Sequence, residues 1–105
     1  MKIITKEIEA ALAKSDPQTA TKPIFKLFGG GACTWLVYAR QQDEPDVLWG
    51  LADLGMGCVE WGTFSLSELL SIKFPPFGLG IERDLHFKGD KTIEQYMEKD
   101  SLCGC

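Results

Sequence analysis

The chain has 105 residues, of which 45% are hydrophobic and 25% are charged, a composition typical of one globular domain over residues 1–105. No apolar run approaches the roughly 20 residues of a membrane span, and residues 1–6 lead into an acidic amphipathic segment instead of a signal-peptide core, so we expect a cytoplasmic protein. The net charge is −4 and the basic residues are scattered, so the chain lacks the basic stripe with which nucleic-acid-binding proteins neutralise phosphates.

The first third of the chain predicts a helix followed by two strands. Residues 5–15 have the apolar spacing of a short amphipathic helix, with Thr5 as the N-cap and Asp16-Pro17 as the stop. Apolar, β-forming runs follow at residues 24–28 and 33–40, on either side of three consecutive glycines. Because a strand and not a helix follows the glycines, they predict a hairpin and not a phosphate-binding loop.

Residues 47–52 and 58–64 predict a third and a fourth strand, joined by a glycine-rich corner. In that corner Gly55 and Gly57 permit positive φ angles, and the carboxylate of Asp53 can accept a hydrogen bond from its own turn. The pattern favours a structural hairpin corner. The alternative is a binding surface, whose candidate residues are Asp53, Gly55, Met56, Gly57 and Glu60.

The last third predicts a helix, an extended segment and a further helix. Ser65 and Glu68 have the spacing of a capping box at the start of a helix that runs to Ile72. Residues 81–87 are predicted to be extended, and a final helix begins near Thr92. Short links between the strands predict an α+β fold, an antiparallel four- to five-stranded meander with two to three short helices packed on one face. We expect the aromatic side chains to pack in its core, namely Trp35, Trp49, Trp61, Phe64 and Phe87.

The best candidate for catalysis is the alternating set Glu82, Asp84 and His86. A strand projects such residues from one face, and two carboxylates with an imidazole suit Mg²⁺ or Mn²⁺, which could activate water against a phosphodiester. Glu60 or Asp53, from strands expected to be neighbours, could complete that site. The sequence favours the alternative, a solvated strand face or a structural ion pair, because exposed strand faces also alternate polar residues.

Two of the four cysteines, Cys103 and Cys105, form a weak candidate for soft-metal binding near the end of the chain. No histidine or further cysteine is close in sequence to complete a zinc site. Cys33 and Cys58 lie in apolar runs and are expected to be inert, buried thiols. We therefore expect neither a metal nor an organic cofactor.

Several short segments together resemble the family called domain of unknown function 2958. They are KLF at 26–28, TWL at 34–36, GLADLGMG at 50–57, EWG at 60–62, SLSEL at 65–69 and ERDLHF at 82–87. The resemblance implies a small cytoplasmic protein of the kind encoded on conjugative plasmids and integrative elements, near anti-restriction and replication genes. It implies no catalytic residues. The Cys-Gly-Cys tail departs from the family pattern.

From these observations we expect a non-enzymatic protein that binds a host- or element-encoded protein partner as an accessory factor of a mobile genetic element, acting against a host defence system. Two other classes stay open. One is a metal-dependent nuclease or hydrolase that uses Glu82, Asp84 and His86. The other is a nucleic-acid-binding module, which the acidic charge balance disfavours.

Overall fold

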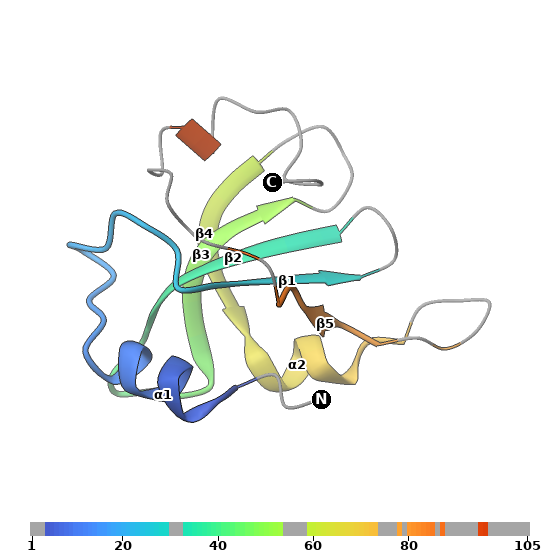
Figure 1. Cartoon of the computed structure of the whole chain (residues 1–105), viewed down its shortest axis with the longest axis horizontal. Coiled ribbons are helices and arrows are strands. Elements are labelled where there is room, and N and C mark those ends of the chain that lie inside the picture. The colour runs from blue at the N-terminus through green and yellow to red at the C-terminus, as the bar shows by residue number, and fades with distance from the viewer. Residues whose placement is uncertain are drawn as a thin grey trace.

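The computed structural model describes residues 4–29, 33–53, 59–73, 78, 80–85, 87 and 95–96. Two helices and five strands occur in the described residues (Figure 1), with Gln95 and Tyr96 helical in addition. Their bounds are α1 Lys6–Ala13, β1 Phe25–Gly29, β2 Cys33–Arg40, β3 Val47–Asp53, β4 Val59–Ser65, α2 Leu66–Ser71 and β5 Glu82–Arg83. Within this part of the chain, no helix has the length and apolar content needed to cross a membrane.

The five strands form one antiparallel sheet in the order β4-β3-β2-β1-β5. The first four strands follow one another as a meander, because short connections join neighbours only in antiparallel pairs. The predicted α+β meander is therefore confirmed, in its five-stranded form. The extended segment predicted at residues 81–87 supplies β5, which pairs with β1 and not with β4.

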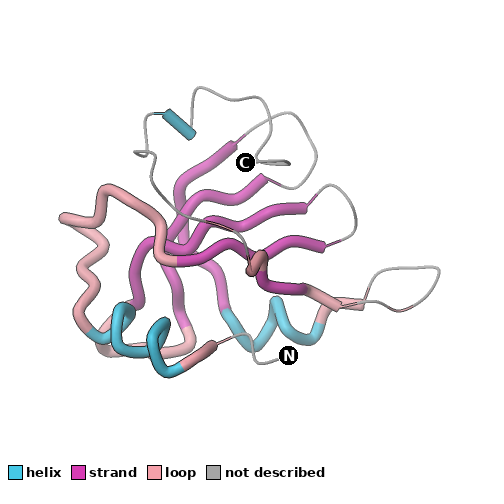
Figure 2. The backbone as a smooth tube through the Cα atoms, viewed as in Figure 1, coloured by secondary structure: helices cyan, strands magenta, loops and turns pink. Residues whose placement is uncertain are grey.

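One face of the sheet, here called the helix-covered face, packs against both helices (Figure 2). The Thr5 hydroxyl caps α1 by accepting from the Ile8 N–H at 3.2 Å, which confirms the predicted start of that helix. The apolar stripe of α1 and one residue of α2 meet alternate residues of β1, β2 and β3 there. The buried members are Ile8, Leu12, Phe25, Leu27, Trp35, Val37, Leu48, Leu69 and Ile81.

The other face of the sheet, here called the open face because neither α1 nor α2 packs on it, carries a second cluster of buried residues in the described part of the chain. Leu36 and Tyr38 of β2 and Leu51 of β3 are buried there together with Tyr96. Trp61 and Phe87 are only partly buried against this cluster. Strand alternation therefore supplies apolar side chains to both faces, but the two helices cover only one of them.

A β-bulge at Tyr38 changes which face the end of β2 presents. Val37 pairs with Gly50, and the next pair is Ala39 with Trp49, so Tyr38 is an extra residue in the ladder. Arg40 consequently lies opposite Leu48 on the helix-covered face, where its guanidinium forms a two-pronged ion pair with Glu9 of α1. The bulge thus lets the end of β2 bind the first helix.

The second helix is capped differently from the expected capping box. The Ser65 hydroxyl accepts from the Glu68 N–H at 3.3 Å, as predicted. The additional partner is Asp46, which precedes β3 and whose carboxylate accepts from the Ser65 hydroxyl at 2.5 Å and the Ser67 N–H at 2.9 Å. The loop before β3 therefore holds the start of α2, a contact 19 residues apart in sequence.

Candidate functional site

The acidic strand predicted as a catalytic face is placed as alternation requires. Glu82 lies opposite Phe28 and Arg83 opposite Leu27, so Glu82 and Asp84 project from the open face. Asp84 Oδ2 lies 3.6 Å from Nζ of Lys26, a side chain that is 6% exposed. The third member, His86, lies outside the described residues. For Asp84, the structural ion pair is thus the arrangement that the structure shows.

The two carboxylates expected to complete that metal site lie on strands that are distant from β5 in the sheet. Glu60 is on β4, at the opposite edge from β5, and Asp53 is on β3. Four strand spacings of about 4.8 Å separate β4 from β5, a distance of roughly 19 Å. The expectation that these strands are neighbours is wrong, because β5 pairs with β1. Among the described residues, no three His, Cys, Asp or Glu residues gather where they could hold a metal ion.

The candidate binding surface at the glycine-rich corner is divided between the two faces. Asp53 is 1% exposed and pairs with Val59, whereas Glu60 pairs with Ala52, so the two carboxylates lie on opposite faces. Gly55, Met56 and Gly57 lie outside the residues that the structure describes. The same holds for the cysteines of the weak soft-metal candidate, Cys103 and Cys105.

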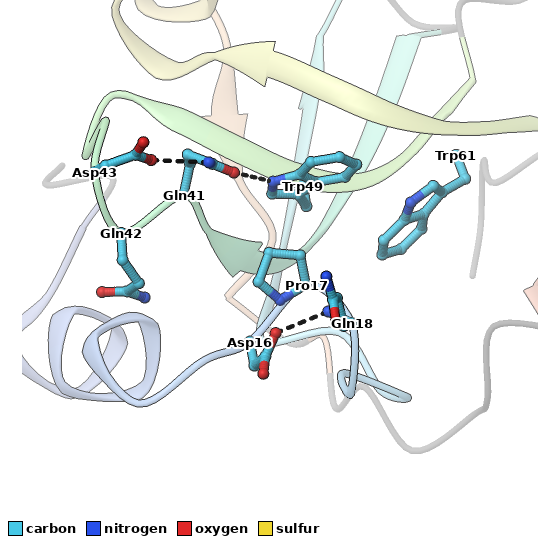
Figure 3. A pocket seen from close by; sticks show the side chains of 8 residues that line it. All are labelled: Asp16, Pro17, Gln18, Gln41, Gln42, Asp43, Trp49 and Trp61. Carbon is cyan, nitrogen blue, oxygen red and sulfur yellow. Dashed lines mark hydrogen bonds between the residues drawn. The ribbon is translucent and has the colours of Figure 1, made fainter.

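A different site appears on the open face, a groove of about 690 Å³ (Figure 3). The connector after α1 forms one wall, and the loop between β2 and β3 together with two tryptophans forms the other. We call it the tryptophan groove. Its lining residues are Asp16, Pro17, Gln18, Gln41, Gln42, Asp43, Trp49 and Trp61.

The two tryptophans of the groove come from adjacent strands and lie close together. Trp49 of β3 and Trp61 of β4 have ring centroids 6.3 Å apart at an interplanar angle of 31°. Tyr38 packs edge-on against Trp61, with centroids 5.2 Å apart at 69°, and supports that ring from within the core. Both indoles are only partly buried, so each presents apolar surface to the groove.

A chain of hydrogen bonds fixes the indole of Trp49. Its Nε1–H donates to Gln41 Oε1 at 2.8 Å, and Gln41 Nε2 donates in turn to Asp43 Oδ1 at 2.8 Å (Figure 3). Because the amide both accepts and donates, its orientation is determined. The aromatic wall of the groove is thereby linked to a carboxylate in the β2-β3 loop.

Further hydrogen bonds hold the loop and the connector on either side of the groove. Gln42 Nε2 donates to the carbonyl oxygens of Ser15 and Arg40, at 3.1 and 3.2 Å, which binds the β2-β3 loop to the end of α1. Asp16 Oδ1 accepts from the Gln18 N–H at 2.9 Å, a local turn that directs the chain past Pro17. The groove therefore has walls that are positioned before any ligand arrives.

The groove combines aromatic surface with negative charge. Of the eight described residues that line it, two are carboxylates and none is basic. Such a set can bind a ligand by stacking and by charge, but it contains no nucleophile next to a base. The sequence analysis did not identify this site, because Asp16 and Pro17 have the pattern of a helix stop and residues 41–46, between two predicted strands, carry no motif of a binding site. The signal that the sequence offers is a polar residue directly after one predicted strand, Gln41, followed by a tryptophan in the next strand, Trp49.

The fold and site together define a small α+β protein with an antiparallel meander sheet and an aromatic groove. Residues 2–104 match the model of a family described as protein of unknown function (DUF2958). The chain belongs to that family, as the resemblance of its motifs implied. Comparison with curated proteins and with solved structures gave no match.

Proposed function

We propose that this protein is a non-enzymatic binding protein and that a protein partner docks in the tryptophan groove. The observation that carries the proposal is the pair of partly exposed indoles of Trp49 and Trp61 in a preformed groove. Tryptophan is enriched among the residues that dominate binding energy at protein interfaces. A groove whose walls are already held in place also loses little conformational entropy when the partner binds.

A protein partner fits the groove better than a nucleic acid does. Bases can stack on tryptophan, but such platforms need cations that follow the phosphate backbone. Here the aromatic rings are accompanied by Asp16 and Asp43, and the whole chain carries a net charge of −4. The carboxylates would repel phosphates at the very place where a base would stack.

The biological setting that we propose is that of an accessory factor of a mobile genetic element. Membership of the family supports this setting, because the resemblance implies small cytoplasmic proteins encoded near anti-restriction genes. In this role the protein binds a host- or element-encoded partner in the cytoplasm and thereby inhibits a host defence system.

The test is affinity capture from host lysate with matched variants. Wild type is compared with Trp61→Ala and with Gln41→Ala, which keeps both indoles but removes the bond that orients Trp49. The control is Leu70→Ala, since Leu70 is 40% exposed on α2, at the helix-covered face. A partner retained by wild type and Leu70→Ala but depleted at least fivefold by both groove variants supports the proposal. Equal capture by all four folded proteins would refute it.

A further inference from the structure

We infer that the tryptophan groove binds an arginine side chain in an extended, basic segment of the partner. The inference rests on the proposed function and adds the chemistry of the ligand. It follows from three properties of the groove, which are its charge, its aromatic surface and its remaining hydrogen-bond acceptors.

The charge of the groove favours a cationic ligand. Asp16 lies on the connector and Asp43 on the β2-β3 loop, so the two carboxylates flank the groove from its two walls (Figure 3). Both are exposed, and no basic residue is present among the described lining residues to neutralise them. A cation entering between the two walls is attracted by both charges, whereas an anion is repelled.

The aromatic surface selects for guanidinium among cations. Arginine stacks its flat, weakly hydrated head on an indole face, and tryptophan is the best aromatic partner for a cation. The two indoles, tilted 31° to each other with centroids 6.3 Å apart, offer a broad aromatic surface beside the carboxylates. A lysine ammonium is a compact and strongly hydrated charge, and it gains less from such a surface.

The groove also has acceptors for the several N–H groups of a guanidinium. Among the described residues, the carboxylates of Asp16 and Asp43 each accept a hydrogen bond at Oδ1, from Gln18 N–H and from Gln41 Nε2, and none at Oδ2. All the hydrogen bonds of the Gln42 amide within the described structure come from Nε2, which leaves Oε1 as an acceptor. Oxygens on both walls of the groove can therefore accept hydrogen bonds from a basic segment that binds there.

A neutral oligosaccharide is the strongest rival ligand, because sugars also stack on tryptophan and bond to amides and carboxylates. A neutral sugar gains no electrostatic attraction from the carboxylates of Asp16 and Asp43. Binding a neutral ligand would also displace water from Asp16 and Asp43 without supplying a counter-charge, which costs free energy. The observations therefore favour the arginine segment.

The experiment is calorimetric titration of the full chain with a capped peptide of three arginine-glycine repeats, at about 50 mM salt, where surface charges are weakly screened. The matched probe is the same peptide with citrulline for arginine, which keeps the shape and removes the charge. A third peptide has lysine in place of arginine. We expect the arginine peptide to bind about tenfold or more tightly than the citrulline peptide and about threefold more tightly than the lysine peptide. Equal binding of the arginine and citrulline peptides would overturn the inference.

Charge-neutral variants locate the binding. Asp43→Asn and Asp16→Asn should each weaken the arginine peptide about threefold to tenfold. Glu82→Gln makes the same charge change at the far edge of the sheet and should leave the affinity within about twofold. If Glu82→Gln weakens binding as much as Asp43→Asn does, the attraction is non-specific and the inference is wrong.

Two further probes separate the rival ligands, maltohexaose for a sugar and a thymidine oligonucleotide for a single strand. Tighter binding of either probe than of the arginine peptide would overturn the inference. The proposed function is tested separately, by the affinity capture from host lysate. If capture depends on Trp61 and Gln41 but the arginine peptide does not bind, the function stands and only the ligand chemistry is wrong.

Discussion

Trp35, Trp49 and Trp61 occupy three successive strands, yet they have two different roles. Trp35 is 5% exposed and packs under the helices, whereas Trp49 and Trp61 are partly exposed in the groove. The expectation that all three rings pack in the core is confirmed for Trp35. For the other two it holds in part, because Trp61 packs against Tyr38 but also lines the groove. Apolar alternation predicts the faces of a sheet but not which face is covered.

This difference predicts unequal costs of truncation. Trp35→Ala should lower the free energy of unfolding by about 3–5 kcal/mol, because it removes a buried ring from the core between the sheet and the two helices. Trp61→Ala should cost less, about 1–2 kcal/mol, since part of that ring already contacts water. Urea unfolding followed by far-ultraviolet circular dichroism measures both. Equal losses would mean that the Trp61 ring is core and not groove surface.

The sequence predicted the first four strands to within about a residue, but it overestimated the fifth, since residues 81–87 were expected to be extended and β5 spans Glu82–Arg83. It also missed contacts between distant loops. The bounds of β2 coincide with the prediction because Gly and charged residues flank an unbroken β-forming run. The bulge at Tyr38 and the Asp46 cap of α2 were not predictable, since each depends on a partner strand or loop remote in sequence. The groove walls depend on the same kind of contact.

A pair of facing glycines tests the close approach of strands beside the bulge. Gly50 of β3 pairs with Gly62 of β4, but a Cβ at Gly50 would lie 1.9 Å from the Leu36 carbonyl oxygen, whereas one at Gly62 would meet nothing within 4 Å. Gly50→Ala should therefore destabilise the fold by about 1–3 kcal/mol. Gly62→Ala should be neutral or stabilise by up to about 1 kcal/mol. Thermal and urea unfolding of both variants provide the measurement, and similar effects would contradict the close approach.

The cap of α2 predicts a dependence of stability on pH. Hydrogen bonds from the hydroxyls of Ser65 and Ser67, and from the Ser67 N–H, hold the pKa of Asp46 below its ordinary value of 3.8. The ionised carboxylate of Asp46 therefore contributes fully to the stability of the folded protein above pH 3.8. This contribution is lost as the pH falls through the lowered pKa of Asp46 in the folded state.

Asp46→Asn should accordingly be less stable than wild type at neutral pH, and the difference should shrink as the pH is lowered below about 4. Urea midpoints across that range provide the measurement. Glu44→Gln, at an exposed position of the same loop, is the control and should show no such convergence. If the stability difference between Asp46→Asn and wild type grew as the pH was lowered, the proposed role of the ionised Asp46 carboxylate would be contradicted.

The order of the strands in the whole sheet determines which acidic residues lie together, and the sequence motifs alone could not predict that order. The sequence predicted the α+β meander and the shared face of Glu82 and Asp84. It could not place β5, because a segment near the end of the chain can pair with either free edge of a four-stranded meander. Pairing with β1 brings Asp84 to Lys26 and separates the acidic strand from Glu60.

The binding function predicts that divalent metal does not stabilise the protein. Adding Mg²⁺ or Mn²⁺ should leave the melting temperature of wild type unchanged, because a ligand raises it only by binding the native state. Asp84→Asn and Glu82→Gln are compared, and only the former removes the ion-pair partner of Lys26. A metal-dependent rise that both variants abolish would favour the hydrolase interpretation instead.

Binding of a cationic partner segment in the tryptophan groove can be followed at the indole N–H signals in a ¹H–¹⁵N NMR spectrum. The chain has three tryptophans, so Trp35 serves as an internal control for Trp49 and Trp61. On titration with the arginine-glycine peptide, we predict that the signals of Trp49 and Trp61 shift in proportion to occupancy while that of Trp35 stays in place. Signals that all remain fixed, or a Trp35 shift as large as the other two, would contradict the claim.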